Sequence, residues 1–146
     1  MKRTIPPIKE VKKRKITIAS AKDKGRRLQQ HICRKISELT GYEWGSNGDD
    51  KPIESRPMGQ SGTDVRLESH VQKLFPFSTE CKWQEQWSIM QWMKQAKSNQ
   101  AKNAEWIIFC RHSHMVPHAI AILDADTFFR MLALIPENKR GEIGGP

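Results

Sequence analysis

Residues 61–83 read SGTDVRLESHVQKLFPFSTECKW and contain two short runs typical of β-strands, at about 63–68 and 76–82. Side chains alternate between the two faces of a strand, so the spacing assigns each residue to a face. In each run one face is mostly apolar, and the opposite face carries ionisable groups. The groups of interest on these faces are Asp64, Glu80 and Lys82. Charged groups oppose burial, so their presence on core-building strands needs a physical reason.

A metal site is one such reason. If the two strands pair as a hairpin around Ser69–Leu74, Asp64 lies opposite the region of Glu80, and Lys82 shares their face. Two neighbouring carboxylates repel each other unless a cation joins them, and Mg²⁺ or Mn²⁺ prefers such oxygen ligands. The lysine can position or activate a water, or stabilise charge on a phosphate. The pattern fits hydrolysis of a phosphodiester; the alternative is an exposed sheet face in which Lys82 forms a salt bridge.

The patterns on either side of this stretch predict a small mixed α/β domain. A helix is expected to begin near Ser20 or Asp23 and to end at Gly41. Residues 41–62 are rich in Gly, Asn, Asp and Pro, and they predict a loop with one strand near Pro52–Met58. The later elements are expected to be a helix at 85–98, strands at Glu105–Arg111 and Pro117–Leu123, and a last helix that Asp124 or Asp126 caps and Pro136 ends.

The net positive charge of the chain is concentrated at its N-terminus. The 146 residues carry a formal net charge of +9, and residues 1–27 hold 11 of the 25 basic residues against two acidic ones. A segment of this charge suits a polyanion such as nucleic acid. The alternatives are a solubilising tail or a localisation signal. The candidate DNA contacts in this segment are Lys12, Lys13, Arg14, Lys15, Arg26 and Arg27.

Several other classes of protein are disfavoured by composition. No apolar run approaches the roughly 20 residues that a membrane span needs, and the charged N-terminus is unlike a signal peptide. The three cysteines are widely spaced and odd in number, which fits a reducing compartment. We therefore expect no membrane partner and a cytoplasmic location, in the host cytoplasm if the gene is phage-encoded. The histidines of CRHSHMVPH, at 110–118, match no standard zinc spacing.

The order of motifs resembles that of a known superfamily. GTDV followed by ECK, with a helix before and a glutamine-bearing helix after, resembles the PD-(D/E)XK nucleases, with Thr63 in place of the usual motif proline. Within that superfamily, GRRLQQ, RPMGQSGTDVRL, FPFSTECKWQEQW and QWMKQA resemble small phage-type nucleases grouped with Holliday junction resolvases. The resemblance covers roughly 23–125. It implies a restriction-endonuclease-like αβββαβ core with a central mixed sheet flanked by helices.

The resemblance also implies roles for individual residues. Asp64 and Glu80 match the motif carboxylates that hold Mg²⁺ or Mn²⁺, and Lys82 matches the catalytic lysine. Gln29, or Gln30 if the register slips by one, stands where many members carry a glutamate in the first helix, and Gln95 lies on the helix that follows the ExK strand. Both glutamines are candidates for supporting the site. Arg56 and Arg66 flank it in sequence and are candidate phosphate clamps.

These patterns together predict three segments and a function. A basic N-terminal arm at 1–22 is expected to precede a nuclease domain at 23–136 and a flexible tail at 137–146. The expected function is a Mg²⁺-dependent DNA endonuclease that is structure-selective and resembles a junction resolvase, acting in recombination, repair or replication. The resemblance implies a homodimer, because resolving a junction requires two cuts. The alternatives are a nuclease for DNA ends or flaps, and a non-catalytic nucleic-acid-binding module with the same fold.

Overall fold

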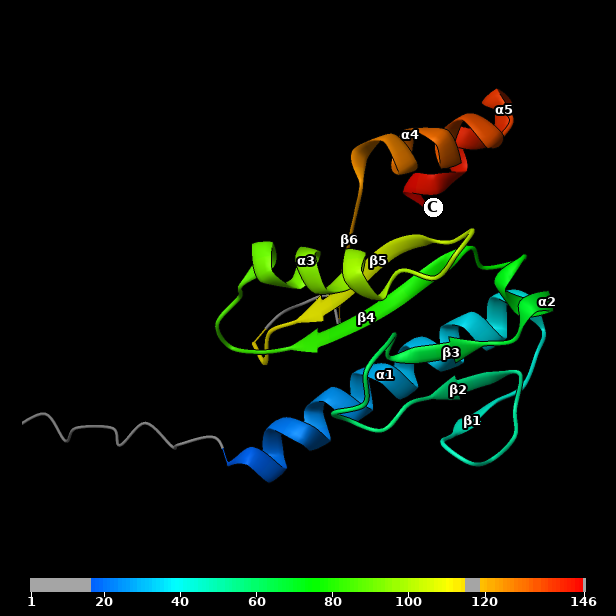
Figure 1. The fold of residues 1–146 in the computed structure, drawn as a ribbon. Helices are drawn as coiled ribbons and strands as arrows, with labels where there is room; N and C mark the ends of the chain where they lie inside the picture. Colours follow the sequence, from blue (N-terminus) through cyan, green and yellow to red (C-terminus); the bar gives the residue numbers. More distant parts are fainter. Residues whose placement is uncertain (1–16, 115–118, 146) are drawn as a thin grey trace, which may run out of the picture.

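The computed structural model describes residues 17–114 and 119–145, and it shows a mixed α+β fold (Figure 1). Helices flank two three-stranded sheets, so the predicted mixed class is confirmed. Several residues with predicted roles lie outside the described ranges, namely Lys12, Lys13, Arg14, Lys15 and His118. No helix of the described ranges combines the length and the hydropathy that crossing a membrane requires.

The first helix, α1, spans Ile18–Thr40 and is longer than predicted. The hydroxyl of Thr17 caps it by accepting a hydrogen bond from the Ser20 backbone N–H (3.2 Å), so the helix begins before either predicted cap. The expected boundary between arm and domain, at 22 and 23, therefore falls inside α1. The helix ends as predicted at Gly41, whose φ of 78° is the left-handed conformation that glycine adopts without strain.

The first sheet contains strands β1 (Trp44–Ser46), β2 (Ile53–Ser55) and β3 (Val65–Leu67) in that order. β1 runs parallel to β2, and β2 runs antiparallel to β3. A short helix, α2 (Ser69–Gln72), then leads to the second sheet. Strand β1 was not predicted, because three residues carry too little periodicity to distinguish a strand from a loop.

The second sheet contains β4 (Phe77–Trp83), β5 (Glu105–Arg111) and β6 (Ile120–Leu123). β4 is parallel to β5, and α3 (Ile89–Asn99) is the helical crossover that a parallel pair requires. β5 pairs antiparallel with β6. The strands agree with the predicted positions within a few residues, whereas α3 begins four residues later than expected.

The expected pairing of 63–68 with 76–82 is wrong. β3 pairs with β2, β4 pairs with β5, and α2 occupies the connection that a hairpin would have used. A backbone hydrogen bond from Asp64 N–H to the Thr79 carbonyl (2.9 Å) links the start of β3 to the middle of β4. The two sheets therefore meet at Asp64, and no single central sheet is formed.

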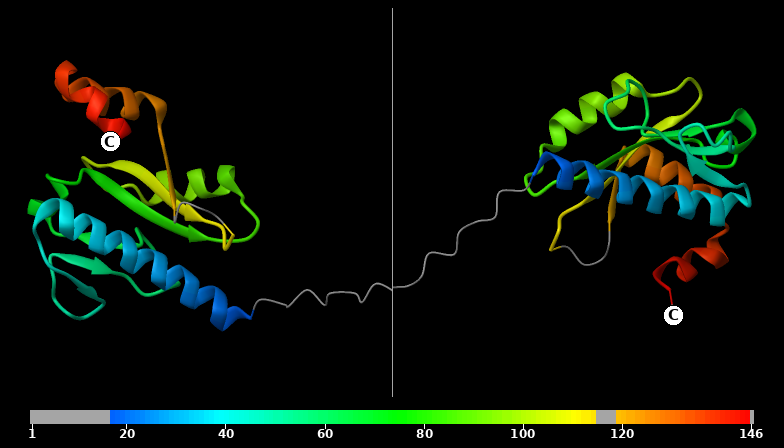
Figure 2. Two further views of the ribbon diagram at one scale, coloured as in Figure 1. Left: turned by 180° about the vertical axis from the view of Figure 1, so that it is seen from behind. Right: turned by 90° about the horizontal axis from the view of Figure 1, so that it is seen from below.

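Helices α1 and α3 lie on opposite sides of β4 and β5 (Figures 1 and 2). The apolar stripe of α1 packs with Ile53, Val65, Val71 and Cys81. On the other side, Trp92 and Ala96 of α3 pack with three buried side chains of β5, which are Trp106, Ile108 and Cys110. The predicted faces of β4 are confirmed, because Cys81 faces α1 while Glu80 and Lys82 face α3. Both faces are covered, and residues 77–81 are consequently all buried.

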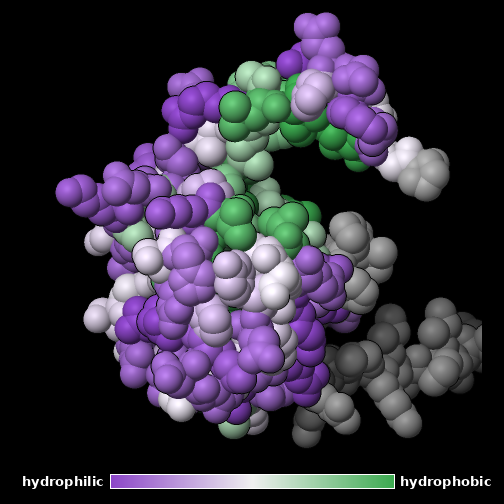
Figure 3. Space-filling model, turned by 90° about the vertical axis from the view of Figure 1, so that its right-hand side faces the viewer, coloured by the Kyte–Doolittle hydropathy of each residue, from purple (hydrophilic) through white to green (hydrophobic). Residues whose placement is uncertain are grey.

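After β6 the chain projects away from the two sheets and their helices, which are here named the body (Figure 1). Asp124 caps α4 (Ala125–Leu134), which is followed by α5 (Glu137–Arg140) and a 3₁₀ turn, η1 (Gly141–Gly144). The expected tail at 137–146 is thus helical over 137–144. Together 125–144 form a projection, here named the C-terminal arm, that is separated from the body by an open groove (Figure 3).

Candidate active site

Asp64, Glu80 and Lys82 lie together where the two sheets meet. The carboxylate Oδ2 of Asp64 accepts a hydrogen bond from the Cys81 backbone N–H (2.7 Å), and the Asp64 N–H is bonded to Thr79. These two bonds fix the aspartate against the backbone of β4. The side chains of Glu80 and Lys82, on the face of β4 toward α3, interact with its carboxylate. The residues converge as predicted, although the route differs from a hairpin.

Glu80 is a buried carboxylate with one unsatisfied oxygen. Its side chain is 1% exposed, and Oε1 accepts a hydrogen bond from Asn99 Nδ2 (2.8 Å). The same amide group of Asn99 also donates to the Gly62 carbonyl (3.1 Å), which ties α3 to the loop before Asp64. Oε2 is buried and makes no hydrogen bond to any residue in the described part of the chain. An unpaired buried carboxylate oxygen is destabilising, so this atom requires a balancing group.

The raised pKa values of Asp64 and Glu80 also indicate that the pair needs a balancing group. Burial raises the pKa of Glu80 to about 7; the Asn99 hydrogen bond opposes this rise, and the charge of Asp64 adds to it. Burial also raises the pKa of Asp64, against the Cys81 N–H bond and the charge of Lys82. Two adjacent ionised carboxylates are therefore unfavourable here, and a proton or a cation must reduce their repulsion.

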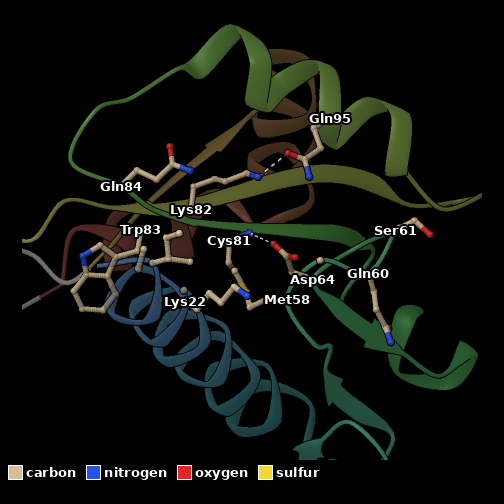
Figure 4. Close-up of a pocket in the computed structure, with 14 residues that line it drawn as sticks. Lys22, Met58, Gln60, Ser61, Asp64, Cys81, Lys82, Trp83, Gln84 and Gln95 are labelled. Carbon is tan, nitrogen blue, oxygen red and sulfur yellow. Dashed lines mark hydrogen bonds between the residues drawn. The ribbon is translucent and has the colours of Figure 1, made fainter. Parts of the chain in front are cut away.

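Lys82 is held at the site by a residue of α3. Its Nζ donates a hydrogen bond to Gln95 Oε1 at 2.6 Å (Figure 4). The interaction orients a flexible ammonium group and leaves its charge to act on the carboxylates of Asp64 and Glu80, because an amide carries no charge. Gln95 therefore lies beside the site, as the sequence predicted, and positions Lys82.

Gln29 approaches the same carboxylates from the opposite side. It is 1% exposed in α1, and its Oε1 accepts a hydrogen bond from the Ser55 hydroxyl (3.0 Å). Hydrogen bonding to Gln29 lowers the pKa of Asp64, so the amide favours the ionised aspartate. The first helix thus brings Gln29 to the site as predicted. Ser55 was not predicted as its partner.

The site opens into a cavity of about 590 Å³ (Figure 4). Its wall includes the start of α1, the loop at 58–61, the end of β4, and Gln95 of α3. Asp64 and Lys82 line this cavity, whereas the buried Glu80 does not. A ligand entering the cavity would therefore meet Asp64 and Lys82 first, with Glu80 behind them.

Asn99 is a partner of Glu80 that was not predicted from the sequence. It lies four residues after Gln95, and residues at this spacing share a face of a helix. Gln95 accordingly forms a hydrogen bond with Lys82, and Asn99 forms one with Glu80, the two charged residues of the ExK motif. The regular spacing of polar residues on α3 was a signal that could have identified it.

The arginines that were predicted to contact DNA do not gather at the candidate active site. Arg66 binds the buried Glu54 (2.9 Å), its cross-strand neighbour, and the Lys51 carbonyl (3.2 Å), and it does not line the cavity. Its role here is to neutralise Glu54 within the first sheet. Arg56 donates to Gln60 Oε1 (3.3 Å) on the glycine-containing loop. Arg26 and Arg27 are exposed on α1, where Arg27 pairs with Asp23 (2.6 Å).

The arrangement of oxygen atoms fits a divalent cation bound by two carboxylates. Asp64 and Glu80 would be its protein ligands, because their carboxylates interact directly and Glu80 Oε2 has no donor partner within the described ranges. Mg²⁺ binds commonly through one or two carboxylates while waters and a substrate phosphate complete its shell. The two carboxylates of this site are therefore sufficient in number for Mg²⁺.

Comparisons of the chain with protein-family models, with curated proteins and with solved structures find no match.

Proposed function

We propose that the protein is a metal-dependent endonuclease that hydrolyses phosphodiester bonds in DNA. The observation that carries this proposal is the pair Asp64 and Glu80, with an unpaired buried oxygen and Lys82 beside it at the wall of an open cavity. Buried charge of this kind destabilises a fold, so a ligand-binding role accounts for it better than a structural one does.

Each residue has a separate part in this proposal. Asp64 and Glu80 would hold Mg²⁺ or Mn²⁺, which would supply a Lewis acid for the phosphate and lower the pKa of a bound water. Lys82, oriented by Gln95, presents its charge to the phosphate oxygens and can donate a hydrogen bond to them. Gln29, held by Ser55, opposes the rise in the pKa of Asp64 through its hydrogen bond to that carboxylate.

DNA is the substrate that the charge of the chain favours. The excess of positive charge lies in 1–27, which contains none of Asp64, Glu80 and Lys82, although its Lys22 lines the cavity. Such an arrangement separates sequence-independent phosphate binding from the chemistry. We extend the proposal to branched DNA as the preferred substrate and a homodimer as the working unit, because the resemblance of the motifs to junction resolvases implies them. The cysteine pattern adds the cytoplasm as the proposed location.

One observation favours a second function. Gln29 replaces a carboxylate at the first-helix position, so one fewer negative charge is available to a metal. A non-catalytic nucleic-acid-binding module with the same fold would tolerate this change. Such a module would bind DNA without needing Asp64, Glu80 or Lys82.

Cleavage of a panel of labelled DNAs separates the two functions. Four-way junction, flap, duplex and single-stranded substrates are incubated with the full chain in Mg²⁺, in Mn²⁺ and in EDTA. The proposal predicts metal-dependent endonucleolytic products, with the junction cut fastest. Binding without cleavage of any substrate in either metal contradicts the nuclease function and supports the non-catalytic module.

A further inference from the structure

A second cavity, of about 470 Å³, lies between α1 and the ends of β4 and β5. Trp83 lines both this cavity and the candidate active site, so the two are neighbours. The lining residues are Arg27, Leu28, Gln30, His31, Arg34, Trp83 and Arg111. Three arginines and a histidine contribute to the wall and no carboxylate does, which makes the cavity suited to an anion.

Arg111 is the best-positioned of these cations. It pairs in register with Trp83 on the adjacent parallel strand, and its guanidinium lies 4.2 Å from the centre of the Trp83 ring. The aromatic face holds the guanidinium plane and leaves its edge available for hydrogen bonds. The Nε–H of Arg111 is buried and has no hydrogen-bond partner in the described part of the chain. A phosphate oxygen is an acceptor of the required charge.

Two further arginines and the histidine come from one face of α1. Arg27, His31 and Arg34 follow at intervals of four and three residues, which aligns them along the helix. Arg27 is paired with Asp23, but both side chains are at least half exposed, so water and salt weaken this pair. The face therefore retains a positive potential toward the cavity.

We propose that this cavity binds a phosphate group of the DNA strand whose neighbouring segment enters the candidate active site. The inference rests on the proposed function, and it adds the path of the DNA strand. The strand would run from Asp64 and Lys82, past Trp83, to the second cavity between Arg111 and α1.

The test measures DNA binding in EDTA, where no cleavage can interfere. Affinities of the full chain and of Arg34→Gln for a labelled four-way junction and a labelled duplex are measured over a series of salt concentrations. Arg34 is exposed, so its replacement is not expected to unfold the protein. If it contacts a phosphate, the slope of log affinity against log salt on the duplex falls by about 0.9. Lys102→Gln removes the same charge from an exposed turn before β5 and serves as the matched control.

The inference is overturned if Arg34→Gln and Lys102→Gln have the same affinity and salt slope as the unaltered chain. This failure differs from failure of the proposed function, since the nuclease activity can persist while the strand follows another course. Conversely, a reduced slope in Arg34→Gln supports the phosphate site even if the panel of DNAs shows no cleavage. Circular dichroism of each variant verifies that the fold is retained.

A second inference comes from the C-terminal arm. Five of its large apolar side chains are exposed by 42% to 84%, namely Phe128, Phe129, Met131, Leu134 and Ile143. Apolar side chains gather on both sides of the groove between the arm and the body (Figure 3). A large apolar side chain has a surface of about 200 Å². With the exposed fractions of these five side chains, the exposed apolar surface of the arm amounts to roughly 600 Å². This equals the upper end of what a typical monomer leaves uncovered, about 300–600 Å².

The arm makes few contacts with the body. Arg130 forms an ion pair with Glu105 of β5 (2.8 Å), and the neighbouring Thr127 is buried at 4% exposure. At the other end of α4, Arg140 Nε donates to the carbonyls of Leu132 (3.2 Å) and Ile135 (3.1 Å), fixing the corner between α4 and α5. The exposed apolar face therefore belongs to a well-formed helix that is joined to the body mainly near Arg130 and Thr127.

Strand β6, from which the arm departs, is an edge strand without charged residues. Its residues Ile120 and Ala121 are exposed. Edge strands of soluble proteins are usually protected by charge, proline or a covering element, because their outer backbone groups can pair with another strand. In the described residues β6 pairs on one side only, with β5.

We infer that the homodimer of the proposed function, on which this inference rests, forms through this surface, so that a second copy of this chain covers the arm and β6. In a two-fold dimer the same patch of each copy contacts the other, so one arm occupies the groove beside its partner's β6. The apolar area of the arm alone approaches the roughly 800 Å² per partner of a standard stable interface, and the edge of β6 adds to it. The interface lies on α4 and β6, while the candidate active site is lined by α1, β4 and α3.

The oligomeric state of the full chain tests this inference. Sedimentation and light scattering of the unaltered protein should give a dimer, and Phe129→Glu with Leu134→Glu should give a folded monomer. Met90→Glu places the same charge on a 70% exposed methionine of α3 and should remain dimeric. A monomeric unaltered protein, or a double variant that stays dimeric, overturns the inference.

Discussion

Replacing Glu80 by Gln should stabilise the metal-free protein at alkaline pH. In the folded protein the pKa of Glu80 is about 7, compared with an ordinary value of 4.5. This difference corresponds to about 3 kcal/mol of unfavourable free energy once the carboxylate is ionised in both states. Glutamine removes the ionisation and keeps an oxygen that can accept the Asn99 hydrogen bond. The free energy of unfolding at about pH 8 should therefore rise by about 3 kcal/mol.

The pH dependence has a definite direction. A raised folded-state pKa means that the unfolded chain loses its proton first as the pH rises. The contribution of Glu80 is thus fully present below about pH 4.5, declines through about pH 7 and is lost above it. The unaltered protein and Glu80→Gln should accordingly have similar stabilities in acid and diverge toward alkaline pH.

Urea unfolding in EDTA across this pH range measures the effect. Glu137→Gln, at an exposed position of α5, is the matched control and should follow the unaltered protein at every pH. Added Mg²⁺ should stabilise the unaltered protein at about pH 8 in proportion to site occupancy, and it should stabilise Glu80→Gln much less. If Glu80→Gln is destabilised at about pH 8, or if its gain is the same at every pH, then Glu80 is not a buried charge in need of a cation.

The remaining predictions concern other parts of the chain. Lys82→Ala should abolish cleavage and leave junction affinity in EDTA within a few-fold, because most phosphate-binding groups lie elsewhere; unchanged turnover contradicts the role of this lysine. Asn99→Ala removes a hydrogen bond that lowers the pKa of Glu80. In urea unfolding, the loss of stability with rising pH should therefore extend to a higher pH in this variant than in the unaltered protein. Deletion of 1–16, which holds seven basic residues and one acidic residue, should weaken DNA binding and flatten its salt slope by about 0.9 for each phosphate that the segment neutralises; an unaltered slope assigns the segment no part in binding.

The alternation of residues predicted the faces of β4 because it depends only on local geometry. Cys81 and Glu80 lie on opposite faces as their parity required, and Gly41 ended α1 as glycine commonly does. The burial of Glu80 was not predictable in this way. It arises because α3, which lies later in the chain, covers that face of β4 and supplies Asn99.

The errors came from long-range pairing. A hairpin between neighbouring strands is the simplest local arrangement, but β4 instead pairs in parallel with β5, which requires the whole of α3 as a crossover. Arg66 was expected near phosphate because it lies close to Asp64 in sequence. Its cross-strand neighbour Glu54 is twelve residues away, and only the register of β2 and β3 reveals their ion pair.

Single-turnover cleavage of a labelled four-way junction is the most direct test of the central claim. The unaltered chain and Asp64→Asn are purified identically and compared in Mg²⁺ and in EDTA. The account predicts cleavage only by the unaltered chain and only in Mg²⁺, since Asp64 is the carboxylate that lines the cavity and would hold the metal there. Equal cleavage by Asp64→Asn, or cleavage by the unaltered chain in EDTA, would contradict it.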